Sequence, residues 1–360
     1  MGEWGKRDDM CVHSTHPYNA EPPPSALAGH LITPLDTFYV RDHGPIPDID
    51  PVIWRLTVDG LVDRPLFITL EDLRTGFHER TMVATLQCAG NRRAGLLTVC
   101  DLAGEEPWGP GATSTASWTG VALKDVLARA GLRPQAAHIA FQGADVSGDT
   151  TPPQPFGGSI PIHKAVADEV LLAWAMNGEP LTPVHGAPLR VVVPGWIGAR
   201  SVKWLTHVTA RLTPSDNYYQ AVAYRLLPAG AAVDDLAGIP LGPVPLNSAI
   251  LSPVDGARVP PGPTEITGYA FNGDGRAVAR VEISLDGGHD WRPATLRAAS
   301  GPWAWRLWHV TADLPEGETV IAARAWDDAA ATQPEDPHTV WNPKGYVNTS
   351  WHRVTVACGA

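Results

Sequence analysis

A single cysteine followed by two arginines is the segment of this chain best suited to do chemistry. The segment reads Thr85-Leu-Gln-Cys-Ala-Gly-Asn-Arg-Arg93 and places Cys88 between a β-branched run and a turn of small residues. A strand leading into such a turn would hold the sulfur at the edge of a sheet, where a ligand can reach it. Arg92 and Arg93 should lower the pKa of the thiol toward the thiolate, the form that binds metals or attacks electrophiles. The alternative is a buried structural cysteine followed by two surface arginines.

Further cationic side chains lie on both sides of this segment. Arg41 and His43 are two residues apart, so they share a face if the chain is extended there, although each could be a solvated loop charge. A second group surrounds the buried-strand pattern that breaks at Gly195, and clustered cations at strand ends and glycine turns fit the capture of a phosphorylated or otherwise anionic ligand. A set of unrelated surface charges is the alternative. The group consists of His185, Arg190, Arg200 and Lys203.

The composition excludes several classes of protein. The chain has 360 residues and a net charge of −11, whereas a nucleic-acid-binding surface is basic. The four cysteines are scattered without a CxxC pair or zinc-like spacing, which predicts neither a disulfide framework nor a zinc site. No apolar run approaches the roughly 18 residues of a membrane span, and the charged N-terminus lacks the apolar region of a signal peptide. We therefore expect a cytoplasmic protein of about two or three domains.

The residues that carry the chemistry need a scaffold, and the sequence up to residue 240 predicts a mixed α/β one. Residues 1–35 should form an extended arm, because prolines between Pro17 and Pro24 exclude a helix there. Periodicity predicts strands at 54–60, 81–86, 138–142, 188–195 and 207–211, and helices at 70–74 and 121–130. Residues 143–158, which include Asp145, should form a long functional or disordered loop.

The remainder of the chain predicts a second, all-β unit. Residues 228–247 are rich in Pro, Gly and Ala and resemble an inter-domain linker. Short strands follow, with a hairpin signal at Asp286-Gly-Gly288, and they are expected at 266–270, 278–284, 303–308, 319–325 and 353–356. This pattern predicts a β-sandwich of immunoglobulin-like architecture. The predicted division is an arm (1–35), a catalytic domain (36–240) and a β-sandwich domain (241–360).

The segment around Cys88 resembles the molybdenum-cysteine motif of the sulfite oxidase family. The resemblance covers nearly the whole chain and is closest to the plant-type enzyme, which lacks a haem domain. It implies an α+β fold, in which a mixed α/β molybdopterin-binding domain precedes an immunoglobulin-like dimerisation domain. The other matching segments, in order, are Pro17-Tyr-Asn-Ala-Glu-Pro-Pro23, Phe38-Tyr-Val-Arg-Asp-His-Gly-Pro45, Pro188-Leu-Arg-Val-Val-Val-Pro-Gly195, Gly198-Ala-Arg-Ser-Val-Lys-Trp-Leu205, Trp341-Asn-Pro-Lys-Gly345 and Trp351-His-Arg-Val354.

The resemblance implies a Mo-molybdopterin cofactor. One molybdenum would be held by the dithiolene of a pyranopterin and by the thiolate of Cys88, a soft ligand that suits a metal already bound by sulfur. No haem is expected, because the chain has no Cys-x-x-Cys-His motif. The residues that match the family's cofactor contacts are Tyr39, Val40, Arg41, Asp42, His43, Asp145, His185, Arg190, Ser201, Val202 and Lys203.

The implied substrate is sulfite, a small dianion at neutral to alkaline pH. Fixed positive charge beside the metal favours arginine over lysine. Because Arg276 belongs to the last domain, the pocket should lie at a domain junction; eukaryotic nitrate reductases do not keep this arginine. The residues that match the family's substrate pocket are Arg41, Arg93, Trp108, Tyr224 and Arg276.

One position departs from the family pattern. The family usually places a lysine or arginine where this chain has Ala103, and Glu105 and Glu106 follow it, which should weaken the binding of a dianion. Two other functions therefore stay open: a sulfoxide or nitrate reductase with the same cofactor, and a non-catalytic β-sandwich interaction protein without one.

The family also implies a homodimer formed through the last domain. The sequence does not name the electron acceptor, for which oxygen and a soluble cytochrome are candidates.

Overall fold

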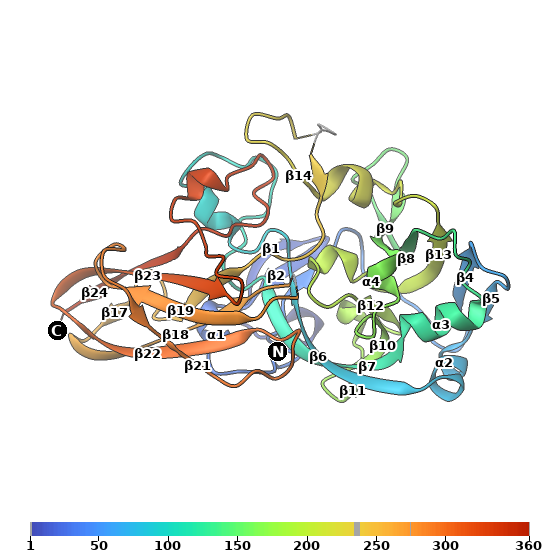
Figure 1. Ribbon diagram of the computed structural model, residues 1–360, viewed down its shortest axis with the longest axis horizontal. Helices are drawn as coiled ribbons and strands as arrows, with labels where there is room; N and C mark the ends of the chain where they lie inside the picture. The colour runs from blue at the N-terminus through green and yellow to red at the C-terminus, as the bar shows by residue number, and fades with distance from the viewer. Residues whose placement is uncertain (1, 234–237, 274, 360) are drawn as a thin grey trace.

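The computed structural model describes residues 2–233, 238–273 and 275–359 (Figure 1). The fold is built mostly from strands, and its few helices are short, as expected for a chain with 35 prolines and 35 glycines. Of the predicted linker at 228–247, residues 234–237 lie outside the described residues. The longest α-helix in the described part of the chain, α3, has eight residues, so no helix there is long enough to cross a membrane.

Two five-stranded sheets form the scaffold of the first part of the chain, on the right of Figure 1. The strands within each sheet pair antiparallel, except for the parallel pair β4 and β13. The first sheet contains β6 (Glu79–Gln87), β7 (Thr113–Ala122), β10 (Leu171–Met176), β11 (Glu179–Pro180) and β12 (Arg190–Val192). The second contains β4 (Leu56–Gly60), β5 (Leu66–Ile68), β8 (His138–Ser147), β9 (Gln154–Pro161) and β13 (Leu205–Arg211).

The helices beside these sheets follow the sequence signals. The helix α2 (Leu70–Gly76) begins with a capping box, in which the Thr69 hydroxyl accepts from the Asp72 amide at 2.9 Å. The helix α3 (Leu123–Ala130) buries its apolar face and ends at Gly131, whose φ of 73° is the left-handed conformation that favours glycine. Both predicted helices are confirmed. A third helix is a single turn, α4 (Ile162–Ala165).

The predicted loop at 143–158 is wrong, because most of it is strand. β8 continues to Ser147 and pairs with β9 as an antiparallel hairpin. The register shifts between Gln142 and Val146, so this strand carries a bulge that contains Asp145. A bulge breaks the period-2 alternation that strand prediction depends on, and it also re-aims a side chain.

The N-terminal arm is partly strand and joins the first part of the chain to the rest. β1 (Cys11–Thr15) and β2 (Tyr18–Glu21) form a sheet with β3 (Val40–Arg41). Within residues 2–23, no α-helix forms before α1 (Pro24–Leu27), which has proline in its first turn. The carboxylate of Glu21 accepts from the amides of Gly109 at 2.6 Å and Gly111 at 2.9 Å. The arm therefore fixes the backbone that lies opposite the Cys88 turn.

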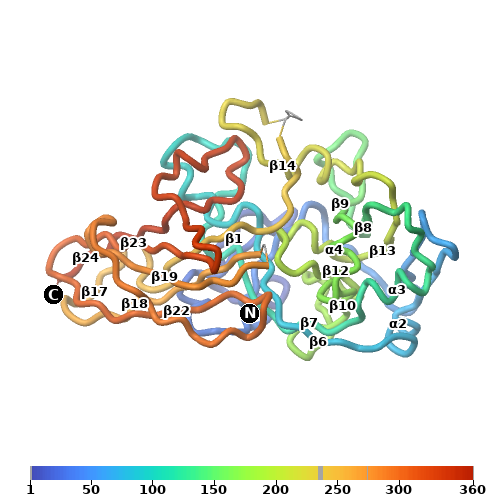
Figure 2. Tube along the Cα trace, in the orientation of Figure 1, coloured from blue at the N-terminus to red at the C-terminus, as the bar shows by residue number. Residues whose placement is uncertain are grey.

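The last part of the chain contains two packed sheets, on the left of Figures 1 and 2. Strands of both sheets contribute to one hydrophobic core, which includes Ile250, Trp308 and Val354. One sheet holds β16 (Asn247–Ser252), β18 (Gly262–Phe271), β22 (Arg306–Leu314) and β21 (Thr295–Leu296). The other holds β17 (Arg258–Val259), β24 (His352–Cys358), β23 (Gly317–Asp327), β19 (Val278–Ser284) and β20 (Arg292–Pro293).

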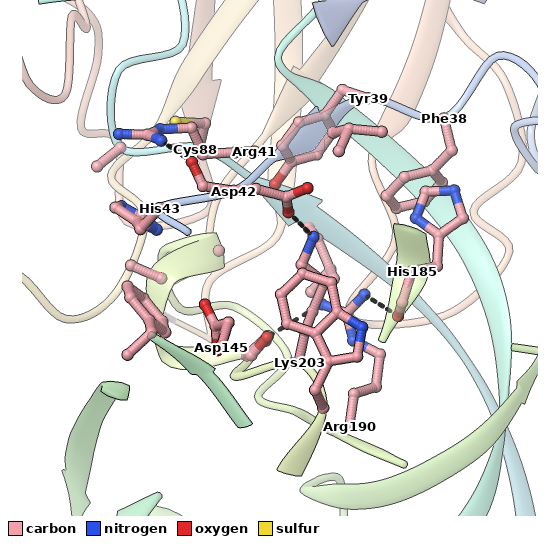
Figure 3. A pocket seen from close by; sticks show the side chains of 18 of the residues that line it. Phe38, Tyr39, Arg41, Asp42, His43, Cys88, Asp145, His185, Arg190 and Lys203 are labelled. Carbon is pink, nitrogen blue, oxygen red and sulfur yellow. Dashed lines mark hydrogen bonds and ion pairs between the residues drawn. The ribbon is translucent and has the colours of Figure 1, made fainter. Parts of the chain in front are cut away.

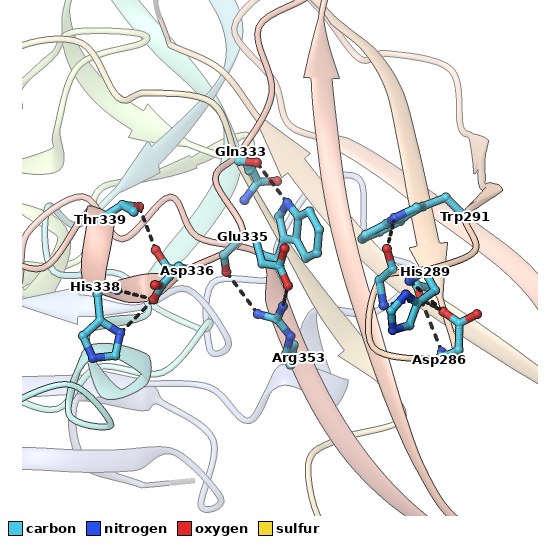
Figure 4. Close-up of polar contacts among 12 residues, drawn as sticks. Asp286, His289, Trp291, Gln333, Glu335, Asp336, His338, Thr339 and Arg353 are labelled. Atoms are coloured by element: carbon cyan, nitrogen blue, oxygen red, sulfur yellow. Dashed lines mark hydrogen bonds and ion pairs between the residues drawn. The ribbon is translucent and has the colours of Figure 1, made fainter.

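Polar contacts close the turns of this part (Figure 4). The carboxylate of Asp286 accepts from the amides of His289 and Asp290 between β19 and β20, which confirms the predicted hairpin. A hydrogen bond from the Ser284 hydroxyl and these amides lowers the pKa of Asp286 to about 2. Arg353 on β24 pairs with Glu335 at 3.2 Å.

Short elements connect the sheets. The small sheet β14 (Arg225–Leu226) and β15 (Ile239–Pro240) lies between the two parts of the chain. The remaining turns are η1 (Glu3–Gly5), η2 (Arg93–Leu96), η3 (Pro183–His185), η4 (Gly198–Arg200), the π-helical η5 (Tyr219–Ala223) and η6 (Pro337–Thr339).

Candidate functional site

Cys88 lies where the long strand β6 ends and turns. Its amide donates to the Ala112 carbonyl at 2.9 Å, and its carbonyl accepts from the Asn91 amide at 3.0 Å. The residue is 7% exposed, and its sulfur accepts from the Gly90 amide at 3.4 Å. The four cysteines are all free thiols. Cys88 is therefore a buried, unbridged thiol at the wall of a cavity, and its position agrees with the strand-to-turn prediction.

This cavity contains about 630 Å³ of space free of atoms, counting the part open to solvent. Figure 3 shows Cys88 and Arg41 at one end and His185, Arg190 and Lys203 toward the other. The described residues that line the cavity include most of the predicted cofactor contacts: Tyr39, Val40, Arg41, Asp42, His43, Asp145, His185, Arg190, Ser201 and Lys203.

The charge around Cys88 differs from the sequence prediction. Burial raises the pKa of the Cys88 thiol, and the positive charges of Arg41 and Arg93 only oppose that rise. The prediction of a lowered pKa is therefore wrong for the protein without a ligand, because desolvation outweighs the cations. Arg92 takes no part, since its guanidinium donates to the carbonyl of Ser350 at 2.8 Å and ties the Cys88 turn to the last part of the chain.

The far end of the cavity is rich in buried positive charge. The Lys203 ammonium pairs with the Asp42 carboxylate and donates to the Val184 carbonyl at 3.0 Å. Arg190 donates to the carbonyls of His185 and Ser201, each at 3.0 Å. Burial, with Lys203 second, lowers the pKa of Lys6 to about 7, and the Lys6 ammonium lies 2.6 Å from His185 Nε2. Three basic side chains thus lie at or behind this end of the cavity, and Lys203 pairs with the Asp42 carboxylate.

Glycine allows this close packing at one point. Gly186 has a φ of 99°, and a Cβ there would lie 2.9 Å from the Lys203 Cβ. A side chain at this position would therefore push Lys203 away from Asp42.

Three polar atoms of the cavity wall have no partner among the described residues: Asp42 Oδ2, Asp145 Oδ1 and Arg190 Nε. Burial raises the pKa of Asp145 to about 7. A buried polar atom without a partner costs roughly 1–3 kcal/mol. The wall therefore offers two acceptors and one donor to a ligand that carries both donors and an anionic group.

His43 and Tyr224 line the cavity together with Arg41. The His43 Nε2 lies 2.7 Å from the Tyr224 hydroxyl, and the ring of His43 stacks on Phe156 with centroids 4.4 Å apart. Burial, followed by the charges of Arg41 and Lys203, lowers the pKa of His43 well below its usual value. Burial also raises the pKa of Tyr224, so its hydroxyl keeps its proton.

A second hollow, here called the funnel, meets the cavity at these same residues. Arg41, His43 and Tyr224 line both spaces. The funnel is lined elsewhere by the loop that carries Ala103, Glu105 and Glu106, by η5 and by the Lys344 segment. The position at which the sequence departs from the family pattern therefore faces a space that leads toward Cys88.

Arg93 is buried beside the funnel, and its guanidinium is occupied by an ion pair and by hydrogen bonds to backbone carbonyls. Its guanidinium forms an ion pair with the Glu105 carboxylate at 2.9 Å and donates to the carbonyls of Lys344 at 3.0 Å and Glu106 at 2.9 Å. It also lies over the ring of Tyr346, 5.1 Å from the centroid. Of the side chain, 3% is exposed.

Four predicted site residues line neither space: Arg93, Arg276, Trp108 and Val202. Arg276 is half exposed and lies 3.5 Å from Asp327 in a different hollow, so the structure does not bring it together with Arg41 and Tyr224, and its place in the substrate pocket stays a prediction. Its loop follows β18 in the last domain, and only the fold decides which face such a loop reaches. Trp108 is fully buried and packs on His13, with ring centroids 4.5 Å apart. Val202 packs in the main core.

The sequence prediction missed two lysines. Lys6 is 1% exposed behind His185, and nothing in the charged N-terminal segment indicated burial. Lys344 lines the funnel and donates to the carbonyls of Val222 at 2.8 Å and Ala223 at 2.9 Å. Lys344 belongs to a segment, Trp341-Asn-Pro-Lys-Gly345, that the resemblance already included, so its position within that match was the available signal.

Comparison with known proteins agrees with this architecture. Residues 43–219 match the family model of the oxidoreductase molybdopterin binding domain, and residues 241–358 match that of the Mo-co oxidoreductase dimerisation domain. The chain is 40% identical to the sulfite oxidase of Gallus gallus, over 98% of this chain and 79% of that protein. It is also 40% identical to the sulfite oxidase of Arabidopsis thaliana, over 98% of this chain and 95% of that one.

The chain spans less of some relatives, covering 65% of the length of the mitochondrial sulfite oxidase of Homo sapiens. Among solved structures it is similar to the sulfane dehydrogenase SoxCD from Paracoccus pantotrophus, with a TM-score of 0.82 and 30% identity over 96% of this chain and 85% of that one. The fold, the two domain matches and these identities over nearly the full length agree. The chain belongs to the sulfite oxidase family.

Proposed function

We propose that this chain is a molybdenum oxidoreductase that oxidises sulfite to sulfate. The observation that carries the proposal is the position of Cys88, which shares a cavity with Arg41 and Tyr224 at the point where the funnel arrives. When bound, the cofactor would supply a sulfur-ligated molybdenum that takes two electrons from the substrate and gives it an oxygen. Members of the family compared above are named for this activity.

The cavity fits the proposed cofactor by its own chemistry. The unpartnered oxygens of Asp42 and Asp145 suit the ring N–H groups of a pterin, and Arg190 Nε suits a phosphate oxygen. Arg190 and Lys203, with Lys6 behind His185, would balance the phosphate charge. Cys88 would contribute its thiolate, and metal binding would displace the proton that burial otherwise holds on the sulfur.

The residues around Arg41 would hold the substrate. A guanidinium cannot lose its charge at any working pH, so Arg41 would bind an oxyanion and stabilise charge that builds on it. The Tyr224 hydroxyl, which keeps its proton, could donate to a second oxygen. Because His43 is neutral, it adds no positive charge and serves to orient Tyr224.

The finer architecture is also part of the proposal. We infer the divisions 1–35, 36–240 and 241–360, with an immunoglobulin-like sandwich in the last. The match of residues 241–358 to a dimerisation domain supports a homodimer. Sedimentation should give twice the 38.4 kDa of one chain, and a monomer at all concentrations would contradict the dimer. An external carrier, such as oxygen or a soluble cytochrome, would accept the electrons.

Replacement of the thiol tests the proposal directly. We expect Cys88→Ser to lose sulfite oxidation by more than about a hundredfold, since even partners outside the metal's own ligands cost 10–100-fold. Metal analysis and visible absorbance of the same sample report whether molybdenum stays bound and whether the thiolate-dependent band is gone. Cys100→Ser, which changes an exposed cysteine, is the control. Full activity of the Cys88→Ser enzyme would refute the assignment.

A further inference from the structure

The funnel is not the positively charged entrance that a dianion would favour. Among the described residues, its lining contains two cations, Arg41 and Lys344, and three carboxylates; with Arg93, which pairs with one of these carboxylates from behind the lining, the formal charges sum to zero. His43 does not change this balance, because its imidazole is neutral. A cleft of one sign concentrates ligands of the opposite sign and speeds their arrival. The carboxylates are Glu105, Glu106 and Asp149.

Of these carboxylates, Glu105 is tied most closely to the substrate-binding machinery. It forms the 2.9 Å ion pair with Arg93, an arginine predicted to bind the substrate. Of the Glu105 side chain, 27% remains exposed, so the carboxylate pairs with Arg93 on one side and faces the funnel on the other. The positive charge of Arg93 is thus compensated within the protein before any anion arrives.

The pair is also held in place by its surroundings. Arg93 donates to the Lys344 and Glu106 carbonyls, and the Lys344 side chain is anchored on η5. An arriving anion therefore meets Arg41 and Lys344 as cations, together with a carboxylate that cannot move away without exposing a buried guanidinium. Leaving one member of a buried pair alone is costly.

We infer that Glu105 sets the charge of the anion that this site accepts, so that it takes a monoanion in preference to a dianion. Among sulfur oxyanions, hydrogen sulfite has that charge. The inference rests on the proposed function only for the name of the substrate, since the charge preference follows from the ion pair. Coulomb energy is proportional to the ligand charge, so one carboxylate penalises a dianion twice as much as a monoanion at the same position.

This proportionality gives a measurable signature. Sulfate and perchlorate are both tetrahedral oxyanions, with two and one negative charges, and both can be titrated into the loaded enzyme without turnover. If Glu105→Gln tightens perchlorate binding by a certain factor, it should tighten sulfate binding by about the square of that factor. We expect about threefold for perchlorate and about tenfold for sulfate. Calorimetry at constant ionic strength and pH measures both dissociation constants.

Three variants separate charge from shape and from folding. Glu105→Asp keeps the charge and should keep the wild-type ratio of the two constants. Glu79→Gln removes an equal charge at the opposite end of β6 from Cys88 and should leave both constants unchanged. If Glu105→Gln did not fold, the wild-type enzyme alone would still decide, because it should bind perchlorate at least as tightly as sulfate.

The outcomes distinguish this inference from the proposed function. Equal factors for the two anions, no change in either, or a wild-type preference for sulfate would overturn the inference. Because anion binding needs no turnover, the squared relation can hold in a protein that does not oxidise sulfite, and then only the proposed function fails. If sulfite is oxidised and the relation is absent, only the inference fails.

Discussion

The cavity and the funnel share three residues but are built differently. The cavity is walled by strand ends and tight turns of the two five-stranded sheets and by residues 38–43 around β3, and its charges include the Lys203–Asp42 pair. The funnel is walled by loops from separate parts of the chain, and its charges are mixed. A rigid wall suits a cofactor that stays bound, whereas loops can change the substrate without disturbing it. Cofactor binding and substrate choice should therefore respond to different mutations.

The largest effect should come from the buried ion pair of the cavity. Lys203→Met leaves the Asp42 carboxylate without its partner, which costs roughly 3–5 kcal/mol of folding free energy and should lower the molybdenum content more than about tenfold. Chemical denaturation and metal analysis measure the two effects. Lys124→Met removes a lysine from a surface pair with Asp168 and should change neither. Full molybdenum content in Lys203→Met would show that the cavity does not depend on this charge.

The second effect is a dependence of folding stability on pH that the burial of Lys6 should produce. In the cofactor-free protein the pKa of Lys6 is lowered to about 7, below its usual value of 10.5 in the unfolded chain. Between these values the unfolded state holds a proton that the folded state has lost, so stability should rise with pH by about 2 kcal/mol from pH 7 to pH 9. Urea denaturation at a series of pH values measures this slope. Lys6→Met should remove the Lys6 part of the slope, and a parallel pair of curves would contradict the burial of its charge.

The third effect should be confined to the funnel. Lys344→Met removes one of two funnel cations and should raise the KM for sulfite about tenfold, the equivalent of one charge-assisted hydrogen bond, with unchanged molybdenum content. Steady-state kinetics and metal analysis on the same preparation test both parts. Lys344→Arg keeps the charge and should restore most of the affinity. A loss of molybdenum in Lys344→Met would remove the distinction between funnel and cavity.

The smallest effect should come from Arg276. Its side chain is half exposed beside Asp327, outside both spaces, so Arg276→Ala should change the KM for sulfite less than about twofold. A rise as large as that of Lys344→Met would support a place for Arg276 in the substrate pocket, as the family resemblance implied.

Much of the fold could be predicted from local pattern. The apolar spacing and Gly131 predicted α3, and the β-branched run before Cys88 predicted the strand that ends there. The hairpin at Asp286 followed from its turn residues. The bulge at Asp145 could not be predicted, because a bulge interrupts the alternation from which strands are recognised.

For the site, residue types alone left alternatives open for Cys88, Arg41 and Lys203; the resemblance to the family singled them out, and the structure brings these three into one cavity. Those side chains lie in segments whose motifs are continuous in sequence. What only the tertiary structure decided is which charges meet: that Glu105 pairs with Arg93, that Lys344 rather than Arg276 enters the funnel, and that Lys6 is buried behind His185. Lys6 and His185 are 179 positions apart in the sequence, and burial, which lowers the pKa of Lys6, is a property of the packed chain and not of any one segment.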